Sequence, residues 1–266
     1  MDDPSAAAEP AAPLRLADVG SEGVIIAGGG SAILLQLANP AIGHAVARHS
    51  DFVANPTRRL EHTLTYVYAI TYGTPEQVAA VQDMVNRAHV PVRSEPDEPV
   101  AYDATDAALQ LWVAATLWHT FVHMRVRLFG PMSERDLDSI YSDYSLIGTT
   151  LQVPAGAWPA DRAAFALYWA AESAKLTVDD TVRQVAHDLL HSTTGPFWLR
   201  ASMPLARLVT AGLLTPELRE AYRMPWSPRL ERRFERALST MATVNSVLPR
   251  RVREWPRHYL LGRLGL

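Results

Sequence analysis

The strongest candidate for chemistry is a set of polar residues that follow Pro56 at the helical spacing i, i+3, i+4 and i+7. They are Arg59, His62, Thr63 and Tyr66. This spacing places one cation, one imidazole and two hydroxyls on a single helical face. Such a face either contacts solvent or lines a pocket, where an arginine beside hydroxyls suits an anionic or oxygen-bearing ligand. The spacing alone leaves both interpretations open.

A second candidate is His89, which stands at the end of the next predicted helix, with Arg93 four residues later. A histidine and an arginine at a helix C-terminus can simply be stabilised by the negative end of the helix dipole. A neutral imidazole there can also bind a metal or haem iron, with the arginine near a haem propionate. Both interpretations stay open on the residues alone.

Two histidine pairs have the i, i+4 spacing at which imidazoles can share a metal ion. They are His119 with His123, and His187 with His191. No carboxylate lies between the first pair, and both pairs are consistent with polar helix faces. We therefore favour surface or pocket-lining side chains over a mononuclear metal site.

Composition excludes several function classes. The chain has 266 residues and no cysteine, which removes disulfides, thiolate catalysis and cysteine-ligated metals. The formal net charge is −3, so the charge balance does not call for nucleic acid as a partner. Apolar residues make up 48% of the chain, which is enough for a sizeable core.

Helix signals position these candidates. Thr74-Pro75-Glu76-Gln77 reads as a capping box, and Gly130-Pro131 ends a long apolar segment that starts near Thr105. Period-2 alternation is scarce, so we predict an all-α single globular domain of about ten helices. We expect a disordered leader at 1–18, the domain at 19–248 and a basic arm at 249–266. The polar, proline-rich segment 93–103 is predicted to be a loop.

The segment from Val24 to Val46 is long and apolar enough to be considered as a transmembrane helix. It contains Gly28-Gly29-Gly30, a glutamine, a proline and a histidine, so we predict a buried helix pair and no transmembrane segment. The three glycines lack the context of a dinucleotide-binding loop and predict a close helix approach or a turn. Without a signal peptide pattern, a cytoplasmic location is expected.

The arm after Pro249 is rich in arginine. It either packs Trp255 and Tyr259 on the body of the domain or contacts anionic lipid or a partner. We favour packing on the body, because one short arm supplies little membrane affinity.

Taken in order, several segments of the chain resemble the latex-clearing-protein and MpaB-type haem oxygenase superfamily. The resemblance runs over roughly residues 20–230. Its best segments are LLQLANPAIGHAVARHSDF (34–52), NPTRRLEHTLTYVYAITYG (55–73), VNRAHVPVR (85–93), LWVAATL (111–117), FGPMSE (129–134) and RLVTAGLLTPELREAYRMPWSP (207–228).

The resemblance implies an all-α fold of the latex-clearing-protein type that binds haem b. In this family a histidine followed by valine and arginine at +3 and +4 is the proximal iron ligand, and His89 matches it. The family's Arg-x-x-x-Thr step beside the haem matches Arg59 and Thr63. His62 stands where the latex-clearing branch has a distal lysine, so it is either a second iron ligand or a distal acid/base.

Three positions depart from the family pattern. Many members have histidine where this chain has Asn39 and Ala114, and an arginine where it has Asn86. These changes leave the implied iron ligand in place and alter the expected polarity of the pocket. His119 and His123 lie on a different face of the same helix from Ala114, so they cannot simply replace a side chain there.

The resulting hypothesis is a haem b-dependent oxygenase or peroxygenase that uses dioxygen or peroxide on a small hydrophobic substrate. Arg59, His62 and Thr63 are its predicted catalytic residues. His89, Arg93, Arg59 and Thr63 are predicted to hold the cofactor, and Tyr66, Trp112, His119 and Phe121 to line the substrate pocket. The alternatives are a non-catalytic haem protein with bis-histidine iron, or a cofactor-free all-α interaction domain. Homo-oligomerisation stays open.

Overall fold

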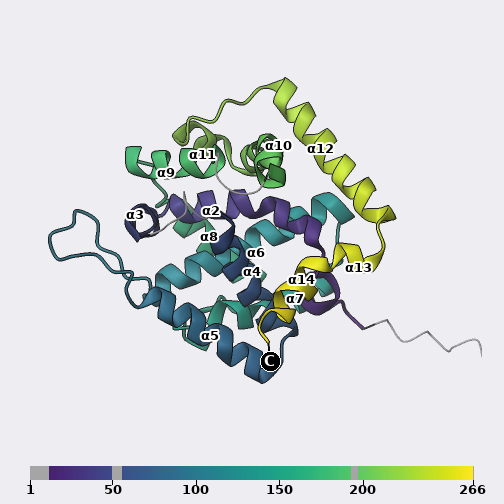
Figure 1. Ribbon diagram of the computed structural model, residues 1–266, viewed down its shortest axis with the longest axis horizontal. Coiled ribbons are helices and arrows are strands. Elements are labelled where there is room, and N and C mark those ends of the chain that lie inside the picture. The colour runs from purple at the N-terminus through teal and green to yellow at the C-terminus, as the bar shows by residue number, and fades with distance from the viewer. Residues whose placement is uncertain (1–11, 50–55, 193–196, 266) are drawn as a thin grey trace, which may run out of the picture.

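The computed structural model describes residues 12–49, 56–192 and 197–265 (Figure 1). These residues form fourteen α-helices and two short 3₁₀ helices, and no strand occurs among them. The α-helices are α1 Leu16–Val19, α2 Gly29–Leu37, α3 Pro40–His49, α4 Pro56–Tyr72, α5 Pro75–His89, α6 Ala107–Phe129, α7 Glu134–Thr149, α8 Arg162–Ser173, α9 Asp180–Leu190, α10 Phe197–Leu213, α11 Pro216–Ala221, α12 Pro228–Val247, α13 Arg250–Arg253 and α14 Trp255–Gly262. The predicted all-α domain is confirmed.

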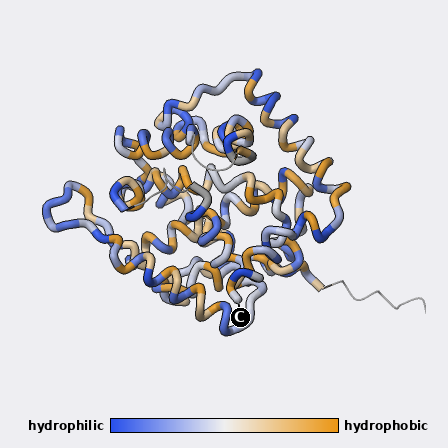
Figure 2. The backbone as a smooth tube through the Cα atoms, viewed as in Figure 1, coloured by the Kyte–Doolittle hydropathy of each residue, from blue (hydrophilic) through white to orange (hydrophobic). Residues whose placement is uncertain are grey.

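Local sequence signals set the ends of the helices that carry the site. Helix α4 stops at Gly73, and α5 begins with the predicted capping box: the Thr74 hydroxyl accepts from the Gln77 backbone N–H, and the Gln77 side chain accepts from the Thr74 N–H. Asp106 caps α6 in the same manner. The connection from α5 to α6 is the expected polar loop, pinned by an isolated bridge between Arg93 and Asp103 (Figure 2).

Helices α2 and α6 lie at the centre of the molecule and pack against each other (Figure 1). Trp112 of α6 is fully buried, and its indole N–H donates to the Leu35 carbonyl of α2 at 3.2 Å. Around Trp118, also on α6, aromatic rings gather from α7, α8 and the segment between them: Tyr141, Tyr144, Trp158 and Phe165. This core fixes the position of α6.

The glycine run 28–30 permits the close helix approach that the sequence predicted. A Cβ atom on Gly30 would lie 2.1 Å from the Thr210 hydroxyl of α10, and one on Gly28 would lie 2.6 Å from Met124 of α6. None of the described helices is long and apolar enough to span a membrane alone. The pair Gly23–Leu37 and Pro40–His49 passes such a test only jointly, and it is bent by 106°.

The chain ends differ from expectation. Residues 1–11 of the predicted leader lie outside the described residues, but α1 falls inside the leader and is held to α7, because Arg15 forms an ion pair with Asp143. At the other end, the arm is helical and α14 packs on α4. Leu260 is buried there, whereas Trp255 and Tyr259 stack on each other and are 58% and 42% exposed. The arm therefore packs on the body through Leu260, and the stacked aromatic pair beside it stays partly exposed.

Candidate active-site cavity

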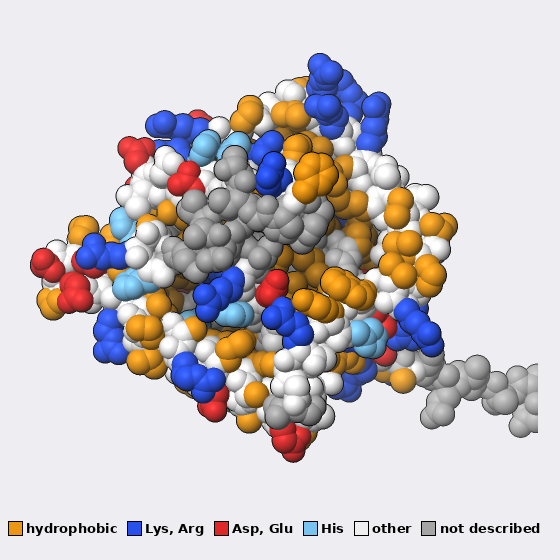
Figure 3. Space-filling model, viewed as in Figure 1, with side chains coloured by type: hydrophobic (Ala, Val, Ile, Leu, Met, Phe, Trp, Pro, Cys, Tyr) orange, Lys and Arg blue, Asp and Glu red, His pale blue; other side chains and the backbone are white. Residues whose placement is uncertain are grey.

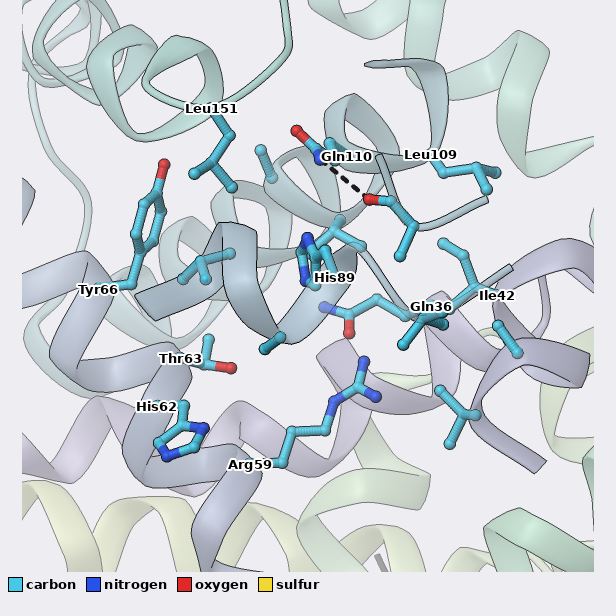
Figure 4. Close-up of a pocket in the computed structure, with 18 of the residues that line it drawn as sticks. Gln36, Ile42, Arg59, His62, Thr63, Tyr66, His89, Leu109, Gln110 and Leu151 are labelled. Atoms are coloured by element: carbon cyan, nitrogen blue, oxygen red, sulfur yellow. Dashed lines mark hydrogen bonds between the residues drawn. The ribbon is translucent and has the colours of Figure 1, made fainter. Parts of the chain in front are cut away.

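A cavity of about 490 Å³ lies among α3, α4, α5, α6 and α7. It brings together five of the residues singled out from the sequence (Figure 4): Arg59, His62, Thr63, Tyr66 and His89. The first four come from α4 and the last from the end of α5. The polar face of α4 therefore lines a pocket.

His89 stands in the cavity wall as a half-buried imidazole. Its Nδ1 atom is buried and has no hydrogen-bond partner. Burial lowers the pKa of His89, and the positive charge of Arg59 lowers it further. Both effects favour the neutral imidazole, which is the form that binds a metal.

Arg59 brings a positive charge into the same cavity. Figure 4 shows its guanidinium pointing toward Gln36 and His89. Burial lowers the pKa of Arg59 to about 10, so the side chain stays protonated at neutral pH. Thr63, one helical turn further along α4, also lines the cavity, and none of the described residues forms a hydrogen bond with its hydroxyl.

The other two polar residues of α4 are placed differently. His62 is exposed, and its ring points away from His89 (Figure 4). Tyr66 is buried, and its hydroxyl donates to the Ile147 carbonyl at 2.8 Å. Burial raises the pKa of Tyr66. Tyr66 is therefore a fixed neutral wall of the cavity, whereas His62 lies at its solvent-facing side.

Most of the remaining wall is apolar. It includes Ile42, Val46, Val85, Leu109, Val113, Leu117 and Leu151. Five polar wall residues were missed from the sequence: Gln36, His49, Arg58, Tyr102 and Gln110. The buried Gln36 amide donates to Thr116 at 3.0 Å, and Gln110 donates to the Ala104 carbonyl at 2.9 Å. Gln36 did carry a signal, because it interrupts an otherwise apolar helix.

Four predicted site residues are not part of the cavity wall. Arg93 is exposed and donates to the Val90 carbonyl at 2.9 Å. Trp112 and His119 each stack on Trp169, with their ring centroids 5.1 and 3.9 Å from the Trp169 ring centroid. Phe121 packs beside Trp118. Their predicted cofactor and substrate roles find no support in this placement.

The three departures from the family pattern have structural counterparts. Ala114 is buried and lines the cavity, so that wall is apolar where a histidine would make it polar. Asn39 accepts from the Ala41 N–H at 3.1 Å at the start of α3. Asn86 accepts from the Gln152 amide at 2.7 Å. His119 and His123 lie outside the cavity wall and do not restore polarity to it.

The histidine pairs do not form metal sites with other residues. The ring centroids lie 4.1 Å apart in each pair; the rings of His187 and His191 are stacked, and those of His119 and His123 are tilted by 42°. Within the part of the chain that the structure describes, no group of three or more histidine, aspartate or glutamate side chains could hold a metal ion.

Comparison with known proteins assigns the class. Residues 17–243 match the family described as ER-bound oxygenase mpaB/B'/Rubber oxygenase, catalytic domain. The chain belongs to this family, and the resemblance found in the sequence is confirmed. Two similar relatives, from Mycobacterium bovis and Mycobacterium tuberculosis, are each 37% identical over 224 residues, which is 82% of this chain and 88% of theirs. Both carry the name "uncharacterized protein". No solved structure matches the chain.

Proposed function

We propose that this oxygenase-family domain is a haem b-dependent oxygenase or peroxygenase acting on a small hydrophobic substrate, with His89 as the proximal iron ligand. The observation that carries the proposal is the buried, unpartnered Nδ1 of His89 in the wall of an apolar cavity. An unsatisfied buried polar atom costs about 1–3 kcal/mol, and such groups are kept where a ligand supplies the missing interaction.

The residues present fit haem better than a bare metal ion. A mononuclear metal site needs three or four protein ligands, and the described residues supply no such group. Haem iron needs one axial side chain, which a single histidine provides. The cavity of about 490 Å³ falls within the usual size of ligand and cofactor sites, about 300–1,000 Å³. Its apolar walls suit a macrocycle, and Arg59 offers a cation for a propionate.

The chain's own residues have separate roles in this proposal. Bound haem b would supply the iron that activates dioxygen or peroxide. His89 would hold the iron as a neutral imidazole, because burial and Arg59 keep its pKa low. The Arg59 guanidinium would supply a positive charge to an anionic oxygen of the oxidant or of the cofactor, and the Thr63 hydroxyl would offer that oxygen a hydrogen bond.

The remaining walls set access and selectivity. His62 is exposed at the cavity's solvent-facing side and carries no coordination role in this proposal. The apolar side chains of α6, including Val113, Ala114 and Leu117, exclude water and accept a hydrophobic substrate. The replacement of a family histidine by Ala114 favours a less polar substrate at that wall.

The test compares two histidines of the same cavity. Purified protein is titrated with haemin, and His89→Ala is compared with His62→Ala. We expect His89→Ala to lose at least about tenfold in haem affinity, because the axial bond is removed. His62→Ala should retain haem with an unchanged coordination state, because its ring points away from His89 (Figure 4).

Two outcomes would contradict this assignment. Normal haem affinity and an unchanged spectrum in His89→Ala would remove His89 from the iron. A six-coordinate ferric spectrum that becomes five-coordinate in His62→Ala would instead support the bis-histidine alternative. Circular dichroism and thermal melts of both variants separate these effects from misfolding.

A further inference from the structure

A second, larger hollow of about 1,220 Å³ lies among α9, α10, α12 and the segment 222–226 that joins α11 to α12, away from the residues assigned to haem. It shares no lining residue with the first cavity, and helix α2 contributes Gln36 to one and Leu34 to the other. We call it the basic groove. Neither its size nor its position is explained by the proposed oxygenase chemistry.

The groove is strongly basic on a chain whose net charge is −3. Five arginines line it, Arg183, Arg207, Arg223, Arg233 and Arg236, against one acid, Asp180. Arg183 forms an ion pair with Asp180, and Arg207 donates to the Leu190 carbonyl at 3.0 Å. In Figure 3, basic side chains gather over the start of α12, with hydrophobic side chains and histidines close by.

Three of these arginines have charges without internal partners. Among the described residues, the side chains of Arg223, Arg233 and Arg236 form no ion pair or hydrogen bond. Arg233 and Arg236 lie at i, i+3 on α12, so both face the groove, and Arg223 reaches it from the end of α11. This arrangement creates a concentrated positive potential that attracts an anion.

The backbone of Arg223 is an independent observation. It has φ of 53°, and it is the one described non-glycine residue with a positive φ. It follows α11 at the position where glycine is strongly preferred, and the next N–H, of Met224, bonds back to the Arg219 carbonyl at 2.8 Å. An arginine in a strained position that glycine would occupy without cost indicates that its side chain is used.

Part of the groove lining is apolar, and we call this part the apolar floor. Its residues are Leu205, Leu208, Met224, Trp226 and Met241. Trp226 is fixed in place, since its indole N–H donates to Glu231 at 2.7 Å and Arg219 lies over its ring. Leu205 is 42% exposed and thus lacks a protein partner over much of its surface. Flexible methionines and leucines of this kind accommodate an alkyl chain.

We infer that the basic groove binds a single-chain anionic amphiphile, with a phosphate or carboxylate headgroup on Arg223, Arg233 and Arg236 and an alkyl tail over the apolar floor. A free inorganic anion would leave the apolar floor unused. A neutral lipid would leave the three cations unpaired. An anionic amphiphile pairs its headgroup with the arginines and covers the apolar floor with its tail. This binding does not depend on whether haem occupies the other cavity.

The test is calorimetric titration of the full chain with palmitoyl lysophosphatidate and with palmitate, both below their critical micelle concentrations, and with inorganic phosphate. We expect saturable 1:1 binding of at least one amphiphile, at least about tenfold tighter than phosphate. The double variant Arg233→Glu/Arg236→Glu should weaken it at least about tenfold, because two charge-assisted contacts become repulsive. The matched control is Arg232→Glu, an exposed neighbour on α12 outside the groove, which should bind normally.

Arg223→Gly separates binding from folding. Glycine relieves the positive φ, so this variant should melt no lower than wild type while binding the amphiphile less tightly. Binding that persists unchanged in the double variant would belong to another site and overturn the inference. Equal affinity for inorganic phosphate and amphiphile would also overturn it, as would the absence of saturable binding in a folded protein.

Discussion

At the scale of single residues, burial decides which histidines stay neutral. His119 is the clearest case outside the haem proposal: its ring stacks on Trp169, and burial, with a smaller contribution from His123, lowers its pKa to about 3. In the unfolded chain the same group takes up a proton near pH 6.5. The unfolded state therefore binds more protons between about pH 6.5 and pH 3.

This difference predicts a pH-dependent loss of stability. As pH falls below 6.5, His119 should contribute up to about 1.4 kcal/mol of destabilisation per pH unit. His119→Phe keeps a ring against Trp169 and removes the titration. Its fall in unfolding free energy between pH 7 and pH 5, measured by urea denaturation, should be smaller than that of wild type. An identical pH profile in the two proteins would mean that His119 titrates normally.

At the scale of helices, the packing of α2 against α10 depends on Gly30 having no side chain. A Cβ on Gly30 would overlap the hydroxyl of Thr210, a fully buried β-branched residue with little freedom to rotate. A Cβ on Gly29 would find its nearest neighbour, Leu60, at 3.8 Å. Adjacent glycines of one helix thus meet different surroundings.

The matched pair Gly30→Ala and Gly29→Ala tests this contact. Overpacking should make Gly30→Ala less stable by about 1–3 kcal/mol. Gly29→Ala should be neutral or slightly stabilising, because alanine favours the helix. Thermal melts of both variants measure the difference. Equal stability of the two would show that α2 and α10 can separate without cost.

The sequence correctly predicted that the chain is helical and that the polar residues of α4 share one face. It gave no correct prediction where the hydrophobic pattern of a helix is weak. The amphipathic pattern of α4 identified Arg59, Thr63 and Tyr66 as one face, and that face lines the cavity. Helix α6 is only weakly amphipathic, so its pattern does not show which side faces the cavity. Trp112 and Phe121 were therefore chosen by residue type, whereas Val113 and Leu117 form the wall.

The missed elements have a similar cause. Helices α1 and α13 have four residues each, too few to show a period. They are held by tertiary contacts, such as the ion pair of Arg15 with Asp143, and these contacts cannot be read from local spacing. The basic groove was not predicted either, because its arginines come from α9, α10, α12 and the turn after α11, which are separate segments of the sequence.

At the scale of the whole molecule, the buried carboxylate of Glu254 joins the two ends of the described chain. It accepts hydrogen bonds from Ser21 at 2.9 Å, Arg250 at 2.7 Å and Arg257 at 3.0 Å. Burial raises the pKa of Glu254, but the bonds from Arg250 and Ser21 and the charge of Arg257 outweigh burial, so the net pKa is lowered. This stabilisation is present at neutral pH and is lost as pH falls below the ordinary glutamate value through the lowered pKa.

Glu254→Gln should accordingly destabilise the protein by about 1.5–3 kcal/mol at pH 7, because hydrogen bonds to a charged group are weakened. Glu61→Gln is the control: it removes an exposed pair with Arg263 at 3.5 Å, for which an effect below about 1 kcal/mol is expected. Denaturant melts at pH 7 compare the two. Equal losses would show that the buried network adds nothing beyond a surface ion pair.

At the scale of the whole protein, we propose that the folded chain binds haem b. The most direct measurement is the visible absorption spectrum of the full chain, expressed with a haem precursor and recorded as purified and after dithionite. We predict a Soret band that moves on reduction and a pyridine haemochrome of the b type. A soluble, folded, haem-supplied protein without a Soret band would contradict the assignment of His89 and its cavity to haem.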